Sequence, residues 1–308
     1  MTASTPSTPW TDVAIIGAGA VGTVLARRLV ERGYRVSAVL SRRREPAQAL
    51  AQAVGAPVGS SDWSDVPFQV PLLLLCVPDD AIEPVARRLA KLERPWPSMT
   101  VAHTSGARTA DALAPVAARG ASTLSLHPMQ TITRESSPSA LDGIYIGIEG
   151  EAGVVARATQ FVRDLGAEAI TVPTAAKTRY HLAGVLASNG LVALMGLVNE
   201  MFASAGIDPD DGSALVGPLV QGTWRNIVDT APEDALTGPV ARGDVGTVVA
   251  HLDALATHLP HVLPAYAALS NEMVRLAVRG GKLSPERAEP VLDALSDALR
   301  RNDDASGW

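Results

Sequence analysis

The sequence has almost no cysteine, few aromatic residues and no excess of positive charge. Cys76 is its one cysteine, so neither an intramolecular disulfide framework nor a cysteine-built zinc site can form. The six histidines are dispersed along the chain, and no metal site is predicted. The formal net charge of −6 argues against a broad nucleic-acid surface, which needs a basic excess. We therefore expect no nucleic-acid partner.

The sequence also lacks segments that would direct the chain to a membrane. The first ten residues, MTASTPSTPW, have no basic region followed by an apolar one, as a secretory signal would. No unbroken run reaches the ~18 apolar residues of a membrane helix, since Asn199 and Glu200 interrupt the apolar segment around them. We expect a cytoplasmic protein with no membrane partner.

Hydrophobic segments alternate with helical patterns in the first half of the chain and then stop doing so. Up to Pro173, short apolar strands such as AIIG, LLLLCV and GIYIGIEG alternate with segments of helical periodicity. This alternation predicts an α/β fold with a largely parallel, doubly wound sheet. Beyond Pro173 only helical patterns follow. The 308 residues suit about two domains, which we predict at 10–173 and 174–300.

The segment GAGAVG, residues 17–22, has the glycine spacing GxGxxG. It follows a strand, opens a helix and leads to a second strand, which is the arrangement of a dinucleotide-binding turn. The helix N-terminus there offers free N–H groups to a pyrophosphate. The alternative is a glycine turn that only packs a helix on a sheet. The predicted cofactor contacts are Gly17, Gly19, Ala20, Val21 and Gly22.

The end of the second strand favours NADP(H) over NAD(H). NAD sites place a carboxylate there for the ribose hydroxyls, whereas this chain has Ser41 followed by Arg42 and Arg43. Guanidinium groups bind a 2′-phosphate bidentately; the alternative is a solvated helix start. Val77 and Pro78 follow the central strand, and we predict that they run under the nicotinamide-side ribose.

Seven segments together resemble a known family. They are GAGAVG, SRR, CVPDDAI, HTSGA, LHPMQT, KTRYHLAGVLASN and LTGPVARGD. In this order they resemble Rossmann-like oxidoreductases with a DUF2520 domain, within the wider 6-phosphogluconate dehydrogenase-like superfamily that includes ketopantoate reductase and β-hydroxyacid dehydrogenases. The resemblance implies a Rossmann-type N-terminal domain and an all-α, 6-phosphogluconate dehydrogenase-like C-terminal domain. It also implies a homodimer.

Lys177 and His181 stand one turn apart in what otherwise reads as a buried apolar helix. Four residues advance a helix by about 400°, so both project on nearly the same face. The resemblance implies a catalytic lysine at this place, paired there with asparagine rather than histidine. An alkoxide formed by hydride transfer needs a proton and a cation, so Lys177 is the predicted proton donor and His181 a partner. Both can also be structural residues.

Other polar residues are predicted to reach the same crevice. His127 lies in LHPMQT, which is similar to a His-Pro-Met segment of prephenate dehydrogenases; this implies a place near the reacting carbon, and a bond to backbone beneath the site is the alternative. Substrate contacts are predicted for Ser105, Asn189 and Arg242, the last as a carboxylate clamp. The alternatives are a nicotinamide contact for Ser105 and a helix-packing role for Asn189. For Asp244 a helix cap is favoured.

The predicted function is an NADPH-dependent oxidoreductase acting on a small oxo or hydroxy acid, similar to ketopantoate or a β-hydroxyacid. One alternative is a prephenate-like dehydrogenase or an imine reductase. Another is a nucleotide-binding sensor or scaffold without catalysis. The sequence does not separate these from a protein that exchanges hydride with a deazaflavin.

Overall fold

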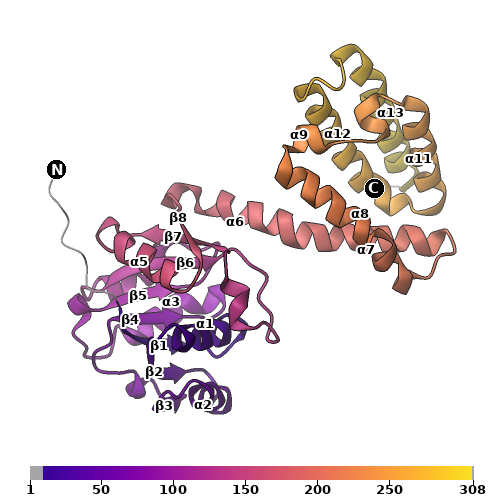
Figure 1. Ribbon diagram of the computed structural model, residues 1–308. Helices are drawn as coiled ribbons and strands as arrows, with labels where there is room; N and C mark the ends of the chain where they lie inside the picture. Colours follow the sequence, from indigo (N-terminus) through magenta and orange to yellow (C-terminus); the bar gives the residue numbers. More distant parts are fainter. Residues whose placement is uncertain (1–9, 307–308) are drawn as a thin grey trace, which may run out of the picture. The chain divides into compact units, whose positions relative to one another are not determined.

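The computed structural model describes residues 10–306, without the side chains of 209–211, 213 and 303–306. The chain forms two compact units, Met1–Asn189 and Gly190–Trp308, and Figure 1 shows a sheet with helices in the first and helices alone in the second. The predicted α/β fold with a helical second part is confirmed. The first unit includes the helix that carries Lys177, which the predicted limits of 10–173 and 174–300 assign to the second domain.

The first unit is built on one eight-stranded sheet with the order β3-β2-β1-β4-β5-β6-β7-β8. All neighbours pair in parallel except β6 and β7. Chain order reverses between β1 and β4, which is the switch point where such sheets bind ligands. The strands are β1 Asp12–Ile16, β2 Arg35–Leu40, β3 Val58–Ser60, β4 Leu72–Leu75, β5 Thr100–His103, β6 Ser122–Pro128, β7 Tyr145–Gly150 and β8 Glu168–Thr171.

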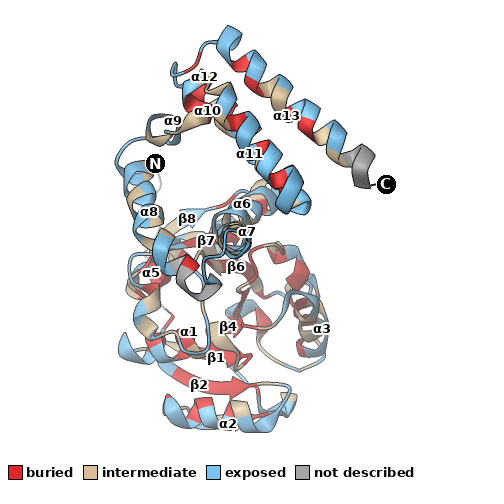
Figure 2. Ribbon diagram, turned by 90° about the vertical axis from the view of Figure 1, so that its right-hand side faces the viewer, coloured by how far each residue is buried: buried red, intermediate tan, exposed pale blue. Residues whose placement is uncertain are grey.

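Helices cover both faces of this sheet because its strands are apolar on both sides. Val13 and Ile15 of β1 pack with α1, α2 and α5, whereas Ala14 and Ile16 pack with α3 and α4. Figure 2 shows the resulting buried strands between exposed helix surfaces. The helices are α1 Ala20–Glu31, α2 Arg44–Ala53, α3 Asp79–Leu89, α4 Ala114–Ala117, α5 Ala152–Asp164 and α6 Lys177–Val185.

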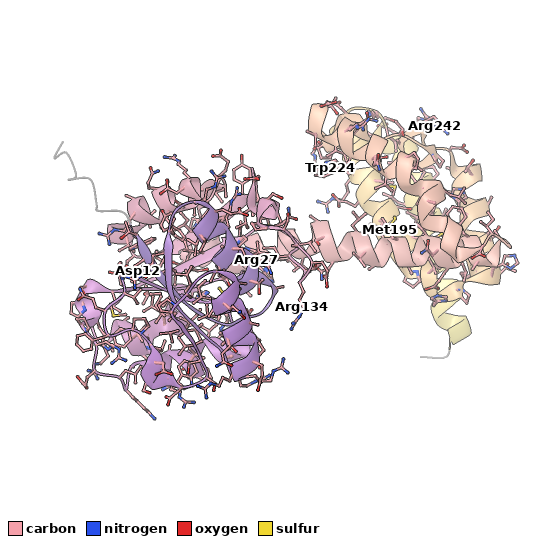
Figure 3. All side chains as sticks on the ribbon, turned by 60° about the horizontal axis from the view of Figure 1, so that its bottom comes forward. Asp12, Arg27, Arg134, Met195, Trp224 and Arg242 are labelled. Atoms are coloured by element: carbon pink, nitrogen blue, oxygen red, sulfur yellow. The ribbon has the colours of Figure 1, made fainter. Side chains whose placement is uncertain are left out.

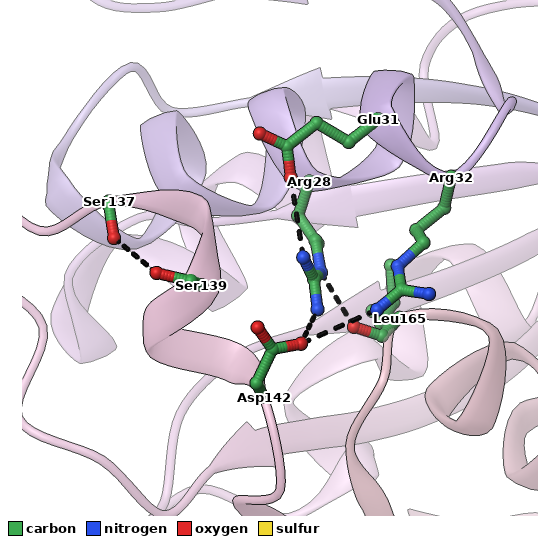
Figure 4. A network of polar contacts seen from close by, with 7 residues as sticks. All are labelled: Arg28, Glu31, Arg32, Ser137, Ser139, Asp142 and Leu165. Carbon is green, nitrogen blue, oxygen red and sulfur yellow. Dashed lines mark hydrogen bonds and ion pairs between the residues drawn. The ribbon is translucent and has the colours of Figure 1, made fainter.

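A buried arginine ties α1 to the far part of the sheet (Figure 4). Arg28 Nε donates to the Leu165 carbonyl oxygen at 2.7 Å, and its guanidinium pairs with Glu31 at 3.3 Å and with Asp142. The Arg28 side chain is 7% exposed, so these partners satisfy a charge that would be costly to bury alone. The contact holds the glycine turn's helix against the β7–β8 half of the sheet.

The second unit is an assembly of helices around its own core. Val248 and Leu252 of α11, Val274 of α12 and Val291 and Leu295 of α13 are buried together there. Helix α11 ends at His258, just before Pro260, whose ring cannot continue the helix. The helices are α7 Leu191–Ser204, α8 Pro209–Asp229, α9 Pro232–Ala235, α10 Pro239–Arg242, α11 Val245–His258, α12 Leu263–Arg279 and α13 Pro285–Ser306.

The helix that begins at Lys177 differs from the sequence expectation in its burial. Within one chain Lys177 is its only fully buried residue between 177 and 204, and Leu182 and Leu186 are 53% and 66% exposed. The expectation of a buried apolar helix is therefore wrong for the single chain, because no other described element covers these side chains. A π-helical turn, Leu186–Gly190, interrupts it before α7 begins.

The same helical stretch passes a membrane-span criterion. Thr174–Ser204 contains an 18-residue window of mean hydropathy 1.7, none of which is buried. The expectation that no stretch qualifies is wrong in this respect, because a mean tolerates the interruptions that break a continuous apolar run. Length and composition alone make this weak evidence for a membrane span, since core helices of soluble proteins also pass.

Candidate functional site

The glycine turn has a packing reason for two of its three glycines. A Cβ on Gly17, which has φ +116°, would lie 2.1 Å from the Cys76 carbonyl oxygen, and one on Gly22 would lie 2.0 Å from the Gly17 carbonyl oxygen. Neither position can therefore carry a side chain. A Cβ on Gly19 would meet no atom within 4 Å, so packing within the chain does not require glycine at this position. Its open face leaves room for the backbone to approach a bound phosphate.

Helix α1 begins directly at this open face. Gly19 is its N-cap, no side chain caps it, and its first residues are Ala20 and Val21. The first N–H groups of α1 thus lack an intrahelical or side-chain acceptor, which is the arrangement that binds a pyrophosphate. The predicted cofactor contacts Gly17, Gly19, Ala20, Val21 and Gly22 are together in one turn and fit a dinucleotide.

The arginines after β2 are exposed beside this turn's sheet edge. Ser41 N–H donates to the Ser60 carbonyl oxygen, and Ser41 Oγ donates to the Arg43 carbonyl oxygen at 2.5 Å, which holds the short connection to α2 in place. Arg42 and Arg43 are exposed, and no ion pair within the described part of the chain involves either. Both guanidinium groups are therefore available to a phosphate.

The segment after β4 joins the glycine turn to the rest of the site. The Cys76 thiol is buried, and burial raises its pKa to about 12, which fits packing and not nucleophilic catalysis. Val77 is half-buried and Pro78 exposed. Pro78 is the N-cap of α3 and has no side-chain cap bond. Asp79 follows in the first turn, where its charge acts on both His127 and Lys177.

Lys177 is enclosed in the first unit. Its residue is 0% exposed, and its Nζ donates to Ser125 Oγ at 2.6 Å. Ser125, also 0% exposed, donates in turn to the Ser105 carbonyl oxygen at 3.0 Å. Ser125 lies on β6, so this chain of bonds fixes the first turn of α6 to the sheet. The sequence reasoning did not single out Ser125, because a serine inside an apolar strand gives no signal by itself.

The environment of Lys177 moves its pKa toward neutrality. Burial lowers that pKa to about 8, while the carboxylates of Glu149 and Asp79 act in the opposite direction. Glu149 is 3% exposed and accepts from Ala110 N–H at 2.7 Å and Thr174 Oγ1 at 2.8 Å. A lysine with such a pKa can give and take a proton near neutral pH.

Two histidines approach one glycine at the surface of this buried group. A Cβ on Gly106 would lie 2.4 Å from His181 Nδ1 and 2.6 Å from His127 Nε2. The distance between the two nitrogens is therefore at most the sum of these two distances. The two rings meet edge to face at 5.7 Å, and both residues are half-buried. The structure thus brings together His127, His181 and Lys177 as a group, as the sequence predicts.

Burial keeps His127 neutral. It lowers the pKa of His127 to about 4, and the positive charge of Lys177 adds to the effect. At neutral pH this imidazole therefore has one N–H and one unprotonated nitrogen. Such a ring can donate one hydrogen bond and accept another without carrying charge.

His103 and Ser105 have structural bonds beneath the site. His103 Nε2 lies 3.0 Å from the Thr109 carbonyl oxygen, and its Nδ1 accepts from Ser105 N–H at 3.2 Å. Ser105 is 6% exposed, and its Oγ accepts from the N–H groups of Ala107 and Arg108. In both bonds the Ser105 hydroxyl oxygen accepts, so its hydrogen remains for another acceptor, and the predicted contact with substrate stays a prediction.

Tyr180 also belongs to the cluster, and the sequence reasoning did not predict it. Its hydroxyl lies 3.4 Å from His127 Nδ1, and the two rings meet edge to face at 5.6 Å. Lys177 Nζ is 5.9 Å from the centre of the Tyr180 ring. Tyr180 stands next to His181 in KTRYH, three residues after Lys177 on the helix; that spacing was the available signal.

Asn189 lies in the π-helical turn and is exposed. Its predicted substrate contact stays a prediction. Its neighbour Ser188 lies 3.0 Å, Oγ to Oγ1, from Thr131 of the LHPMQT segment. A Cβ on Gly184 would lie 2.7 Å from Met129 Sδ, so α6 also packs closely on that segment.

Arg242 lies in the second unit, where Figure 3 labels it. It is exposed and lines a cavity of about 560 Å³ together with Lys282 and Arg287. Lys282 Nζ donates to the Asp234 and Leu236 carbonyl oxygens at 2.5 and 2.8 Å, and the Arg287 guanidinium donates to the Arg242 carbonyl oxygen. The Arg242 guanidinium is thus the cation of this lining that is most open to an anion. Asp244 caps α11 by accepting from Thr247 N–H at 3.1 Å, so the favoured cap is confirmed.

Among the residues that the structure describes, no group of three or more histidine, cysteine, aspartate or glutamate side chains could hold a metal ion. The described site offers a lysine, two histidines and a tyrosine, on the same unit as a glycine turn that fits a dinucleotide. The groups that border the cluster's surface are His127, His181 and Tyr180, with Lys177 behind them.

Two protein families match the chain. Residues 2–128 match a Rossmann-like domain, and residues 144–273 match a domain of unknown function, DUF2520. The resemblance inferred from the sequence segments is thereby confirmed. No curated protein sequence matches.

Solved structures share the fold over nearly their whole length. A candidate NADP oxidoreductase, BF3122 from Bacteroides fragilis, is 24% identical, with 86% of this chain and 98% of that chain covered and a TM-score of 0.69. Protein TM1727 from Thermotoga maritima is 25% identical, with 90% and 98% covered and a TM-score of 0.66. An imine reductase from Myxococcus stipitatus in complex with NADP+ is 15% identical, with 92% and 99% covered and a TM-score of 0.60.

Replacement of Lys177 by methionine should stabilise the protein at pH 7. The wild-type pKa of about 8 lies below that of an unfolded lysine, so the unfolded chain binds more protons between these values and wild-type stability rises with pH there. The Lys177→Met variant does not pay the free-energy cost of burying a charged ammonium group at pH 7. We expect its Tm at pH 7 to exceed that of wild type by about 2–4 °C, measured by circular dichroism, and the gap to narrow from pH 8 to 10.

Lys91→Met is the matched control, because Lys91 is exposed in the same unit. It should leave the Tm within experimental error of wild type at every pH. A Lys177→Met protein that is less stable than wild type at pH 7 would contradict the burial cost assigned to this lysine.

Proposed function

We propose that this chain, which joins a Rossmann-like domain to a DUF2520 domain, is an NADPH-dependent oxidoreductase that reduces the carbonyl group of a small oxo acid. The observation that carries the proposal is the cluster of Lys177, His127 and His181 at the same sheet edge as an open glycine turn. Cys76 contacts that turn, and Asp79, three residues later, acts on the cluster. Nucleotide and proton chemistry thus meet within one compact unit.

The glycine turn and the arginines after β2 support NADPH as the hydride source. Bound NADPH supplies a hydride to an electron-poor carbon. The free N–H groups of α1 would hold its pyrophosphate, and Arg42 and Arg43 its 2′-phosphate. Val77 and Pro78 lie at the β4 carboxyl end, where the nicotinamide half binds in sheets of this type. Two proteins of this fold, from Bacteroides fragilis and Myxococcus stipitatus, are named for NADP or were solved with NADP+, which supports the same cofactor.

The cluster's own residues would handle the proton and the developing charge. When hydride reaches a carbonyl carbon, the oxygen becomes an alkoxide that takes one proton to give the hydroxyl. His127 and His181, at the surface of the cluster, would orient this oxygen by hydrogen bonds, and enclosed Lys177 would stabilise its charge and supply the proton, which His181 could share. The lowered pKa of Lys177, about 8, suits a group that must give up its proton and regain it near neutral pH.

The sequence segments of this chain resemble those of ketopantoate reductase and β-hydroxyacid dehydrogenases, which act on small oxo and hydroxy acids. This is the reason for proposing an oxo acid, similar to ketopantoate or a β-hydroxyacid precursor. An imine is the second candidate substrate, because an imine reductase has the same fold over 92% of this chain. In that reaction the proton goes to nitrogen and an amine forms. We further propose that the protein acts in the cytoplasm.

A second copy of the chain is the proposed partner of the exposed apolar helices. Val192 of α7 and Leu219 and Trp224 of α8 are 72%, 68% and 64% exposed, and Figure 3 labels Trp224 on the second unit. Apolar surface of this extent on neighbouring helices marks an interaction site. Homodimerisation would cover it, and it would do so without a membrane.

Nucleotide binding by the wild type should discriminate strongly between NADPH and NADH. We expect Arg42→Ala combined with Arg43→Ala to weaken NADPH binding at least about tenfold, since it removes charge-assisted bonds to the 2′-phosphate, and to leave NADH binding unchanged. Calorimetric titration measures both. Arg44→Ala is the matched control and should change neither. If the wild type binds neither nucleotide, the oxidoreductase proposal fails.

Turnover should depend on Lys177. In a panel of 2-oxo acids, 3-oxo acids and cyclic imines, we expect NADPH oxidation at 340 nm with at least one compound, and a loss of about 10²–10⁴-fold in kcat for Lys177→Met. The NADPH affinity of this variant should remain. A Lys177→Met enzyme with wild-type kcat would contradict the role given to Lys177.

Light scattering after size-exclusion chromatography should give about twice the chain mass of 32.0 kDa. Leu219→Glu should shift the protein toward the monomer, because a charge in a dry interface is costly. Phe68→Glu, at a residue 66% exposed in the first unit, is the control and should leave the mass unchanged. A wild-type monomer that sediments with lipid vesicles would instead favour a membrane surface.

A further inference from the structure

Tyr180 contacts the candidate catalytic histidine on the side away from the other histidine. Its hydroxyl is 3.4 Å from His127 Nδ1, whereas His127 Nε2 approaches the point near Gly106 that His181 Nδ1 also approaches. The bond is long for O–H···N, as catalytic hydrogen bonds often are without substrate. One ring nitrogen of His127 thus meets tyrosine and the other meets the surface of the site.

The position of Tyr180 is fixed by a glycine on the opposite strand. Gly147 of β7 pairs directly with His127 of β6, and a Cβ on Gly147 would lie 2.6 Å from the Tyr180 hydroxyl oxygen and 2.8 Å from Cζ. Gly147 has no positive φ, so the backbone itself does not call for glycine. The space that it leaves is filled by the tyrosine, which holds the hydroxyl beside His127.

The direction of the hydrogen bond follows from the chemistry of the two groups. A phenol O–H is a stronger donor than a neutral imidazole N–H, and an unprotonated imidazole nitrogen is a stronger acceptor than a phenol oxygen. The hydroxyl hydrogen of Tyr180 is therefore the one that is shared, and Nδ1 accepts it. Burial raises the pKa of Tyr180, so that hydrogen stays on the oxygen. The nearest acceptor is the unprotonated Nδ1 of neutral His127.

We propose that Tyr180 is a positioning residue that donates to His127 Nδ1 and thereby fixes His127 as the Nε2–H tautomer, which points its one hydrogen at the substrate oxygen or nitrogen. The catalytic consequence rests on the proposed function, because it assumes a carbonyl or imine at the surface of the cluster. A neutral imidazole N–H there would polarise the double bond before hydride transfer. The charge of Lys177 behind it would remain available for the alkoxide.

Most of the ionisable groups that act on His127 favour a neutral ring. Lys177, His181 and His103 disfavour a second proton on it, and Asp79 alone favours one. With charge excluded, the choice between the two tautomers is left to hydrogen bonding, and Tyr180 is the group that contacts Nδ1. Without this hydroxyl, no contact among residues 10–189 would select Nε2–H over Nδ1–H.

The tautomer can be read directly by nitrogen chemical shifts of the full-length protein. The chain has six histidines, so ¹⁵N-histidine labelling and long-range ¹H–¹⁵N correlation should resolve them, with His127→Asn identifying the signal of His127. At pH 7 we expect a protonated Nε2 and an unprotonated Nδ1 in the wild type. In Tyr180→Phe, which keeps the ring on Gly147, both nitrogens should move toward averaged shifts.

Two further variants separate the hydroxyl's effect from a general disturbance. Tyr34→Phe removes another half-buried phenol, one that donates to Asp164 at 2.6 Å in the same unit, and it should leave the His127 signals unchanged. Gly147→Ala keeps the Tyr180 hydroxyl but displaces it, and it should reproduce the change of Tyr180→Phe. Thermal unfolding verifies that each variant is folded.

Activity is the second readout. With a substrate in hand, Tyr180→Phe should lower kcat roughly tenfold, the factor of one hydrogen bond, with little change in KM, and Tyr34→Phe should not. A wild-type His127 with Nδ1–H, or identical His127 signals in wild type and Tyr180→Phe, would overturn the proposal even if the enzyme is active. The expected shifts in a protein without any turnover would instead count only against the proposed function. The expected shifts with an unchanged kcat in Tyr180→Phe would overturn the catalytic half of the inference.

Discussion

The hydrogen bond between Lys177 Nζ and Ser125 Oγ, 2.6 Å long and wholly buried, holds the candidate site together. It connects the first turn of α6 to the middle of β6 and continues through Ser125 to the Ser105 carbonyl oxygen. A buried ammonium group is costly, and its bonds and the nearby Glu149 carboxylate offset only part of the cost, since its pKa falls to about 8. A chain that keeps such a group gains from it in some way other than stability.

Glycines then decide what else can stand next to this lysine. Gly106 lets two imidazole rings approach the same point, Gly147 makes room for Tyr180, and Gly184 admits Met129. A Cβ at any of these three positions would lie less than 3 Å from a neighbouring side chain. Alanine there would therefore displace a residue of the site or a residue that packs on it. The same logic holds at the glycine turn, where Gly17 and Gly22 are required by packing and Gly19 alone is open.

A second feature of the protein is the apolar surface that α7 and α8 expose to solvent. Side chains such as Val192 and Leu219 stay in solvent in the single chain, which is unfavourable for their hydrophobic area. Association of two copies would remove this surface from water. Helix α7, which supplies part of the proposed contact, continues from the helix that carries Lys177. Assembly and catalysis would then share one structural element.

The sequence by itself determined the sheet-and-helix order, the dinucleotide turn and the grouping of Lys177, His181 and His127, because these depend on local periodicity, on glycine spacing and on strand ends that meet at one edge. It missed β3, whose three residues carry no pattern, and it took α6 for a buried helix from its composition. The tertiary structure alone decided that Lys177 is enclosed, that Ser125 and Tyr180 are its neighbours and that Ser105 is held by structural bonds. These facts depend on which strand packs against which helix, and the two are separated by tens of residues in the chain. Burial, pKa and hydrogen-bond partners follow from that packing, so no short stretch of sequence determines them.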